Sequence, residues 1–188
     1  MNWEYKAGLG MLTVALVVSG CSDDSAANQS TTGSTTTSAT AMAPAGGAGV
    51  GVAQAQQALQ AAAQAVPNGR AFDAELETDD GQRVFDVKVA SGGNEIKVVV
   101  DSDGRRVISQ NQAGKPSDDV AKVEGAQVDA GRALQAAAEH EPGTTFSEME
   151  IDTNRDGALV WQIELRRADG SEVEVDVDAR SGSVVASR

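Results

Sequence analysis

The six residues Ala58-Leu59-Gln60-Ala61-Ala62-Ala63 recur letter for letter as Ala133-Leu134-Gln135-Ala136-Ala137-Ala138. Further matches follow in the same order in both copies: Pro67 with Pro142, Glu75-Leu76-Glu77 with Glu150-Ile151-Asp152, Val84-Phe85-Asp86-Val87 with Val160-Trp161-Gln162-Ile163, and Val98-Val99-Val100-Asp101 with Val175-Asp176-Val177-Asp178. The offset between the copies grows only at turn positions, as duplicated hairpin units should show. The sequence therefore predicts two tandem copies of one folding unit.

Both copies predict the same order of secondary-structure elements. An Ala-rich helix, expected over 52–66 and again over 128–141, ends at a proline. Strands with alternating apolar and polar residues follow, separated by tight-turn signals at Asp80-Gly81, Gly92-Gly93, Asp103-Gly104, Asp169-Gly170 and Ser181-Gly182. The predicted fold class is α+β: two tandem units, each an N-terminal helix packed on a three- or four-stranded antiparallel sheet. Units of about 60 residues are marginal alone, so we expect the halves to pack together, and the pattern leaves open whether they share one sheet.

The N-terminal residues resemble a bacterial lipoprotein signal. The apolar run from Ala7 to Val18 would span about 18 Å as a helix, which is short of the roughly 30 Å hydrocarbon core of a bilayer. That length is typical of a signal peptide, here assigned to residues 1–20. Val18-Ser19-Gly20-Cys21 then resembles a lipobox, and Cys21 is the only cysteine of the chain. We expect acylation of Cys21 to hold the protein on the extracytoplasmic face of a cell-envelope membrane; the alternative is an ordinary signal peptide or short anchor with an incidental cysteine.

The remaining boundaries follow from composition. Residues 21–51 are nearly all Ser, Thr, Ala, Gly, Asn and Gln, so we expect a disordered tether. The first unit is assigned to 52–112, a linker to 113–125, and the second unit to 126–188.

Within the two units, specific residues resemble the PepSY domain family. In the first unit these are Val66-Pro67-Asn68-Gly69 and Val100-Asp101-Ser102-Asp103-Gly104; in the second they are Glu141-Pro142-Gly143 and Val177-Asp178-Ala179-Arg180-Ser181-Gly182. PepSY domains occur in propeptides of thermolysin-type secreted metallopeptidases and in many cell-envelope proteins. The resemblance implies a role in restraining peptidase activity and supplies no catalytic residues, so we expect a non-enzymatic protein.

Composition excludes several classes of function. The chain of 188 residues has 28 acidic and 15 basic residues and a formal net charge of −13, so we expect no nucleic-acid partner. One cysteine and one histidine cannot form a disulfide or a structural zinc site. We expect no cofactor.

Two local motifs have both a functional and a structural explanation. Asp152, Asn154 and Asp156 match the first half of an EF-hand calcium loop, but position twelve would be Ile163 instead of glutamate, and a β-turn accounts for the same residues. His140 lies between Glu139 and Glu141 at a helix end, without a nucleophile placed by sequence. A surface histidine is therefore favoured over a catalytic one.

The second unit also has a candidate partner-binding surface. An acidic face is expected from Glu172, Glu174, Asp176 and Asp178, which alternate with valines; solubility alone would also explain it. The leading hypothesis is a lipid-anchored envelope protein whose modules bind or restrain a secreted protein, such as a peptidase. The alternative is a structural or sensory spacer without protease inhibition. A small hydrolase is a third and weaker reading.

Overall fold

The computed structural model describes residues 49–188. The assigned signal peptide, Cys21 and residues 22–48 of the assigned tether lie outside the described residues. Among residues 49–188, no helix is both long enough and apolar enough to cross a membrane.

The two Ala-rich segments form helices at the expected places. Helix α1 is Val52–Ala65 and helix α3 is Ala130–His140. Each buries one leucine and three alanines on one stripe: Ala55, Ala58, Leu59 and Ala62 in α1, and Ala130, Ala133, Leu134 and Ala137 in α3. Because alanine side chains are short, both helices pack closely on the sheet.

The remaining sequence forms strands with a mainly alternating burial pattern. In chain order they are β1 (Val50–Gly51), β2 (Arg70–Asp79), β3 (Gln82–Ser91), β4 (Asn94–Asp101), β5 (Val107–Gln112), β6 (Thr145–Thr153), β7 (Leu159–Arg166), β8 (Glu172–Asp178) and β9 (Val184–Ser187). The predicted Asp-Gly, Gly-Gly and Ser-Gly turns contain glycines with positive φ, the conformation that such turns require.

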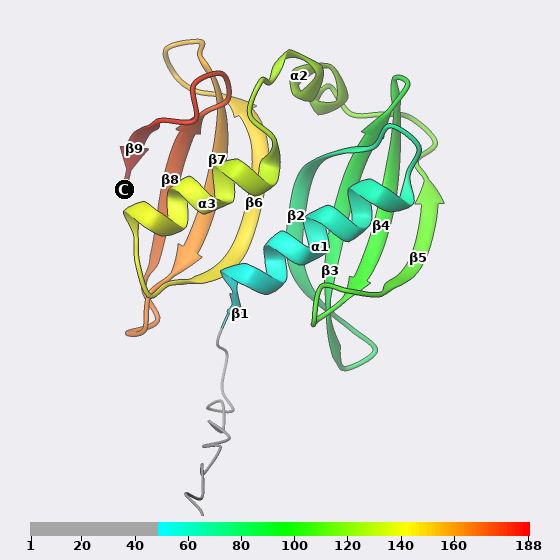
Figure 1. The fold of residues 1–188 in the computed structure, drawn as a ribbon, viewed down its shortest axis with the longest axis horizontal. Coiled ribbons are helices and arrows are strands. Elements are labelled where there is room, and N and C mark those ends of the chain that lie inside the picture. The colour runs from blue at the N-terminus through cyan, green and yellow to red at the C-terminus, as the bar shows by residue number, and fades with distance from the viewer. Residues whose placement is uncertain (1–48) are drawn as a thin grey trace, which may run out of the picture. The chain divides into compact units, whose positions relative to one another are not determined.

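All nine strands belong to one antiparallel sheet, which answers the question that the sequence left open. The order is β5-β4-β3-β2-β6-β7-β8-β9, so the first strand of each unit lies at the centre (Figure 1). Strand β2 pairs with β6 through only three residue pairs, from Asp73 opposite Glu150 to Glu75 opposite Glu148. Strand β1 pairs with the beginning of β6, at Thr145 and Phe146.

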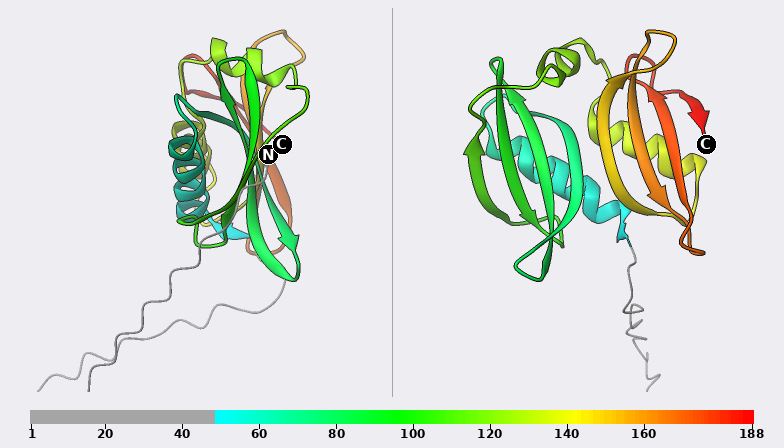
Figure 2. Two further views of the ribbon diagram at one scale, coloured as in Figure 1. Left: turned by 90° about the vertical axis from the view of Figure 1, so that its right-hand side faces the viewer. Right: turned by 180° about the vertical axis from the view of Figure 1, so that it is seen from behind.

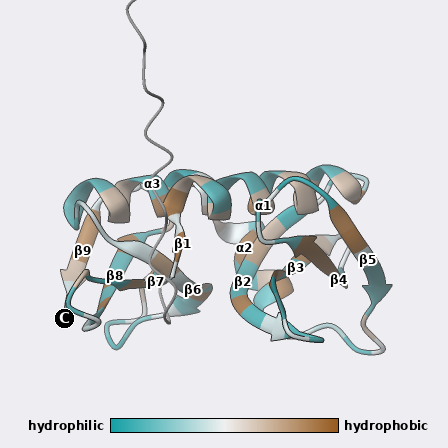
Figure 3. Ribbon diagram, turned by 90° about the horizontal axis from the view of Figure 1, so that it is seen from below, coloured by the Kyte–Doolittle hydropathy of each residue, from teal (hydrophilic) through white to brown (hydrophobic). Residues whose placement is uncertain are grey.

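Helices α1 and α3 lie on the same face of this sheet, each over the strands of its own unit (Figures 2 and 3). Between helices and sheet lies the core, whose largest fully buried side chains include Phe72, Phe85, Phe146 and Trp161. Valine, alanine, leucine and isoleucine supply most of the rest. The α+β class, with two helix-led units, is confirmed.

The structure differs from the sequence-based boundaries in two places. Residues 113–125, assigned to a linker, contain helix α2 (Asp119–Gly125), which buries Val120 and Val123. The Arg70 guanidinium donates hydrogen bonds to the carbonyl oxygens of Glu124 and Ala126, at 3.5 and 2.8 Å, where helical carbonyls lack internal partners. The second difference is β1, which continues the sheet into the last two residues assigned to the tether.

Candidate protein-binding surface

The sheet face opposite α1 and α3 carries acidic side chains where the two units meet. Side chains alternate between the faces of a strand, and the opposed residues Ala74 and Met149 are buried in the core. Their neighbours therefore project to the other face. We call four of these the acidic seam: Asp73, Glu75, Glu148 and Glu150.

The strand register places these like charges directly opposite one another. Asp73 faces Glu150 and Glu75 faces Glu148 across β2 and β6. The row continues outward, because Glu75 also faces Asp86 of β3 and Glu148 faces Glu164 of β7. Opposed like charges destabilise a strand pair, so the junction between the units forms against electrostatic repulsion.

The pKa values of two seam glutamates are raised, in part by this repulsion. Burial raises the pKa of Glu148, and the charges of Glu75, Glu150 and Glu164 raise it further. Burial also raises the pKa of Glu150, together with the charges of Asp73 and Asp152. Carboxylates with raised pKa values accept a proton more readily than ordinary ones.

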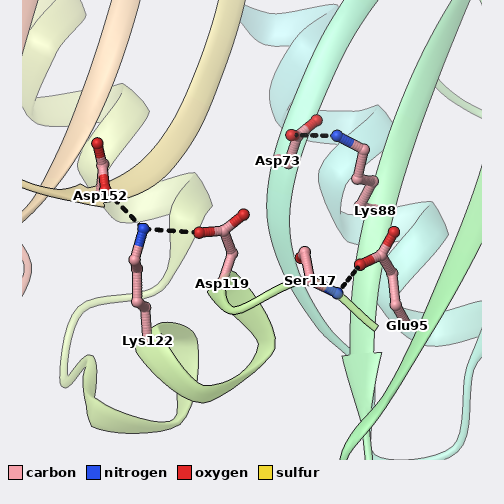
Figure 4. A network of polar contacts seen from close by, with 7 residues as sticks. All are labelled: Asp73, Lys88, Glu95, Ser117, Asp119, Lys122 and Asp152. Atoms are coloured by element: carbon pink, nitrogen blue, oxygen red, sulfur yellow. Dashed lines mark hydrogen bonds and ion pairs between the residues drawn. The ribbon is translucent and has the colours of Figure 1, made fainter. Parts of the chain in front are cut away.

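Within residues 49–188, Asp73 is the one seam residue that pairs with a lysine (Figure 4). Lys88 Nζ lies 2.6 Å from Asp73 Oδ2. Lys122 of α2 bridges Asp119 and Asp152, at 2.8 and 2.6 Å. Within residues 49–188, no ion pair involves Glu75, Glu148 or Glu150, so the centre of the acidic seam keeps uncompensated charge.

The predicted acidic face on β8 is largely neutralised. Asp176 was expected to be exposed, but only 3% of its surface is, and Arg188 Nη1 lies 2.9 Å from its carboxylate. Arg188 also pairs with Glu174, and Arg166 pairs with Glu172 at 2.5 Å. The expectation was wrong for Asp176 because β9 lies beside β8 and brings the following Arg188 to its carboxylate. The alternating pattern of β8 alone does not reveal this.

Asp178, the fourth residue of that predicted face, has a structural role. Its Oδ1 accepts hydrogen bonds from the backbone N–H groups of Arg180 and Ser181 and from the Ser181 hydroxyl. Its pKa is lowered mainly by the Ser181 backbone hydrogen bond. The carboxylate therefore holds the turn that follows β8.

The calcium-loop residues lie in the hairpin between β6 and β7. Asn154 Oδ1 accepts from the backbone N–H groups of Asp156 and Ala158, which is the hydrogen bonding of an Asx turn. Asp152 instead pairs with Lys122. The described part of the chain contains no group of three or more Asp, Glu, His or Cys side chains arranged to hold a metal ion.

His140 is exposed at the last residue of α3. The carboxylate of the adjacent Glu141 accepts hydrogen bonds from Arg167 and Ser187. The structure thus brings together none of the three sequence-predicted groups: His140, the calcium-loop residues and the β8 acids occupy separate places. The acidic seam was missed, although its residues were visible as matched acidic strands, because only the pairing of β2 with β6 opposes them.

Fold and sequence together define the class of protein. A helix on an antiparallel sheet, present twice, corresponds to the family described as "Peptidase propeptide and YPEB domain", or PepSY, which matches residues 54–110 and 127–188. The chain belongs to the PepSY family and carries two of its domains.

The individual proteins to which the chain is similar share less than a quarter of its residues in the aligned regions. The chain is 23% identical over 131 residues to the uncharacterized protein YkoJ of Bacillus subtilis (strain 168), covering 69% of this chain and 71% of that protein. Among solved structures, a candidate lipoprotein from Clostridium difficile 630 shares 23% identity with a TM-score of 0.40, covering 64% of this chain and 82% of the other. The Bacillus subtilis YpmB protein shares 17% identity with a TM-score of 0.26, covering 70% and 94%.

Proposed function

We propose that this protein is a non-enzymatic, lipid-anchored envelope protein whose PepSY domains bind and restrain a secreted protein, namely a peptidase that presents a basic surface. The acidic seam is the contact surface. The observation that carries the proposal is the direct opposition of Asp73 with Glu150 and of Glu75 with Glu148 on the sheet face that α1 and α3 leave uncovered.

Electrostatics supports a cationic partner. Carboxylates that repel one another in the free protein are relieved when arginine or lysine side chains are placed between them, so part of the repulsion becomes binding free energy. A field of one sign also steers an oppositely charged partner toward the surface. Membership of a family described through peptidase propeptides favours a peptidase over other secreted proteins.

The anchor is proposed from the lipobox-like Val18-Ser19-Gly20-Cys21. Acyl chains on Cys21 would keep the PepSY domains at the outer surface of a membrane, where secreted enzymes pass. Metabolic labelling of cells with a fatty-acid probe tests this: label should appear on the wild type and be lost in Cys21→Ala. Equal labelling of both would contradict the anchor and leave the binding proposal untouched.

The binding proposal is tested with secreted thermolysin-type metallopeptidases, measuring complex formation and residual proteolysis. We expect binding that weakens as salt is raised, because exposed charges are screened. The Glu75→Gln/Glu148→Gln variant removes two seam charges and should weaken binding about tenfold or more. The matched variant Asp118→Asn/Asp156→Asn removes two exposed charges elsewhere and should leave binding unchanged.

Equal weakening by both variants would show that net charge, and not the seam, drives the interaction. Binding without loss of proteolysis would retain the partner and reject the restraining role. No complex with any peptidase of this class would favour the alternative of a structural or sensory spacer.

A further inference from the structure

A groove of about 910 Å³ lies on the helix-bearing side of the molecule, on the opposite side of the sheet from the acidic seam. One wall is the C-terminal half of α1 with the turn that leads into β2, and the other is the beginning of α3. Val123 of α2 also lines it. Both PepSY domains and the segment between them therefore contribute to one concave site, whose size is in the range of small-ligand pockets.

The interior of the groove is apolar. Its apolar lining includes small or branched aliphatic side chains: Leu59, Ala63, Val66, Ala71, Val123 and Ala130. Such a surface favours small aliphatic side chains, because an unpaired charged group buried against it would lose its hydration without compensation.

The rim next to α1 is a row of amides. Gln56, Gln60 and Gln64 are spaced four residues apart, so they lie along one side of the helix, and Gln135 of α3 also borders the groove. Gln56 Nε2 donates to the carbonyl oxygen of Gly131 at 3.4 Å, whereas Gln60 and Gln64 are exposed. A primary amide both donates and accepts, as a peptide bond does, so this row matches the repeating N–H and C=O groups of a peptide backbone.

The groove is also locally basic in an acidic protein. Arg70 and Arg132 border it, and within residues 49–188 neither forms an ion pair. Among the described residues, the Arg70 guanidinium donates to the carbonyl oxygens of Glu124 and Ala126, and these neutral acceptors leave its charge in place. The single acid of the lining, Asp129, caps α3 by accepting from the Arg132 backbone N–H at 2.9 Å.

We propose that this groove binds a short extended peptide segment with small apolar side chains and a free C-terminal carboxylate. The aliphatic lining receives the side chains, the glutamine row pairs with the peptide backbone, and the carboxylate lies between Arg70 and Arg132. A peptide fits better than an acyl chain, because an acyl chain has no groups to pair with the amides. The site does not depend on the acidic seam. It binds a negatively charged group, whereas the seam binds a positively charged partner.

The test uses the full chain in lipid nanodiscs and fluorescein-labelled Ala-Ala-Val-Leu with a free carboxylate, followed by fluorescence polarisation. We expect saturable binding, absent from empty nanodiscs. The C-terminal amide of the same peptide should bind about tenfold more weakly, because a charge-assisted hydrogen bond is lost. Arg132→Gln should weaken the carboxylate peptide to the same extent and leave the amide nearly unaffected.

Two further variants keep the result interpretable. Gln60→Trp places a large side chain on an exposed rim position, so it should block the groove without disturbing the core. Arg155→Gln, an exposed arginine in the β6–β7 hairpin, is the matched control and should bind like the wild type. No saturable binding, equal affinity for acid and amide, or full binding by Gln60→Trp would each overturn the proposal. Binding of octanoate at the groove without binding of the peptide would replace it with an acyl-chain site.

Discussion

The two PepSY domains share a fold but stabilise it differently. In both, an aspartate at the end of the third strand holds the following turn. Asp101 Oδ1 accepts from the backbone N–H groups of Arg105 and Arg106, as Asp178 Oδ1 does from those of Arg180 and Ser181. The Val-Asp and Gly residues that carried the family resemblance therefore have a structural function. Positions that differ between the domains show where each depends on its own contacts.

The largest difference concerns the matched turn glycines Gly104 and Gly182. Both have positive φ, at 75° and 78°. A Cβ on Gly104 would lie 2.2 Å from the carbonyl oxygen of Gln54 in α1, whereas the nearest atom to a Cβ on Gly182 is Val128 Cγ2 at 3.5 Å. In the first domain the turn thus packs against helix backbone, which cannot rotate away.

The largest expected effect is accordingly that of Gly104→Ala. The left-handed conformation and the collision with α1 together should lower the free energy of unfolding by about 3 kcal/mol. Gly182→Ala incurs only the conformational cost, about 1 kcal/mol. Urea unfolding of both variants measures the comparison, and equal losses would show that the turn of the first domain does not press on its helix.

The matched aromatic residues Phe85 and Trp161 give the next prediction. Trp161 is fully buried and its Nε1 donates to the carbonyl oxygen of Val128 at 3.0 Å, just before α3. Trp161→Phe leaves that carbonyl without its partner, so we expect a loss of about 2 kcal/mol. Phe85→Leu, which breaks no hydrogen bond, should cost about 1 kcal/mol. A larger loss for Phe85→Leu in the same unfolding assay would contradict this assignment.

The helix starts differ as well. Asp129 caps α3 through its side chain, whereas Gly51, the N-cap residue of α1, has no side chain to do so. Asp129→Ala should therefore destabilise the protein by about 1 kcal/mol. Gly51→Asn, which supplies a cap in a backbone conformation open to any residue, should stabilise by about 0.3 kcal/mol. Thermal unfolding compares the two, and a neutral Asp129→Ala would mean that the cap does not contribute.

The last comparison concerns the seam between the domains. Because the folded-state pKa values of Glu148 and Glu150 are raised above 4.5, the native protein binds more protons than the unfolded chain does. Unfolding free energy should therefore rise as pH falls from neutral through those raised values toward 4.5. Below about 4 it should fall again, as Asp101, Asp152 and Asp178, whose pKa values are lowered, become protonated.

Glu150→Gln isolates this contribution. Removing one of two opposed charges should stabilise the protein at neutral pH by about 0.5 kcal/mol and reduce the rise on mild acidification. Chemical unfolding at a series of pH values measures both. A variant with the full wild-type pH dependence would show that the opposed acids do not interact.

The sequence predicted the helices and hairpin turns that depend on local, repeated signals. Alanine spacing located α1 and α3, and glycine-containing turns located the hairpins, because these signals act over a few residues. The acidic seam depends instead on two strands 75 residues apart, and the burial of Asp176 depends on Arg188, twelve residues away. Helix α2 escaped detection because seven residues with two buried valines give too short a pattern.

The placement of β1 makes the two halves interdependent. Val50 and Gly51 immediately precede the helix of the first domain, yet they hydrogen-bond with Phe146 and Thr145 of the second. An excised first half would lose the neighbour of its N-terminal strand and bare the edge of β2, and an excised second half would bare the whole edge of β6. Each half, expressed by itself, would therefore expose an unpaired strand edge that is open to pairing with another chain.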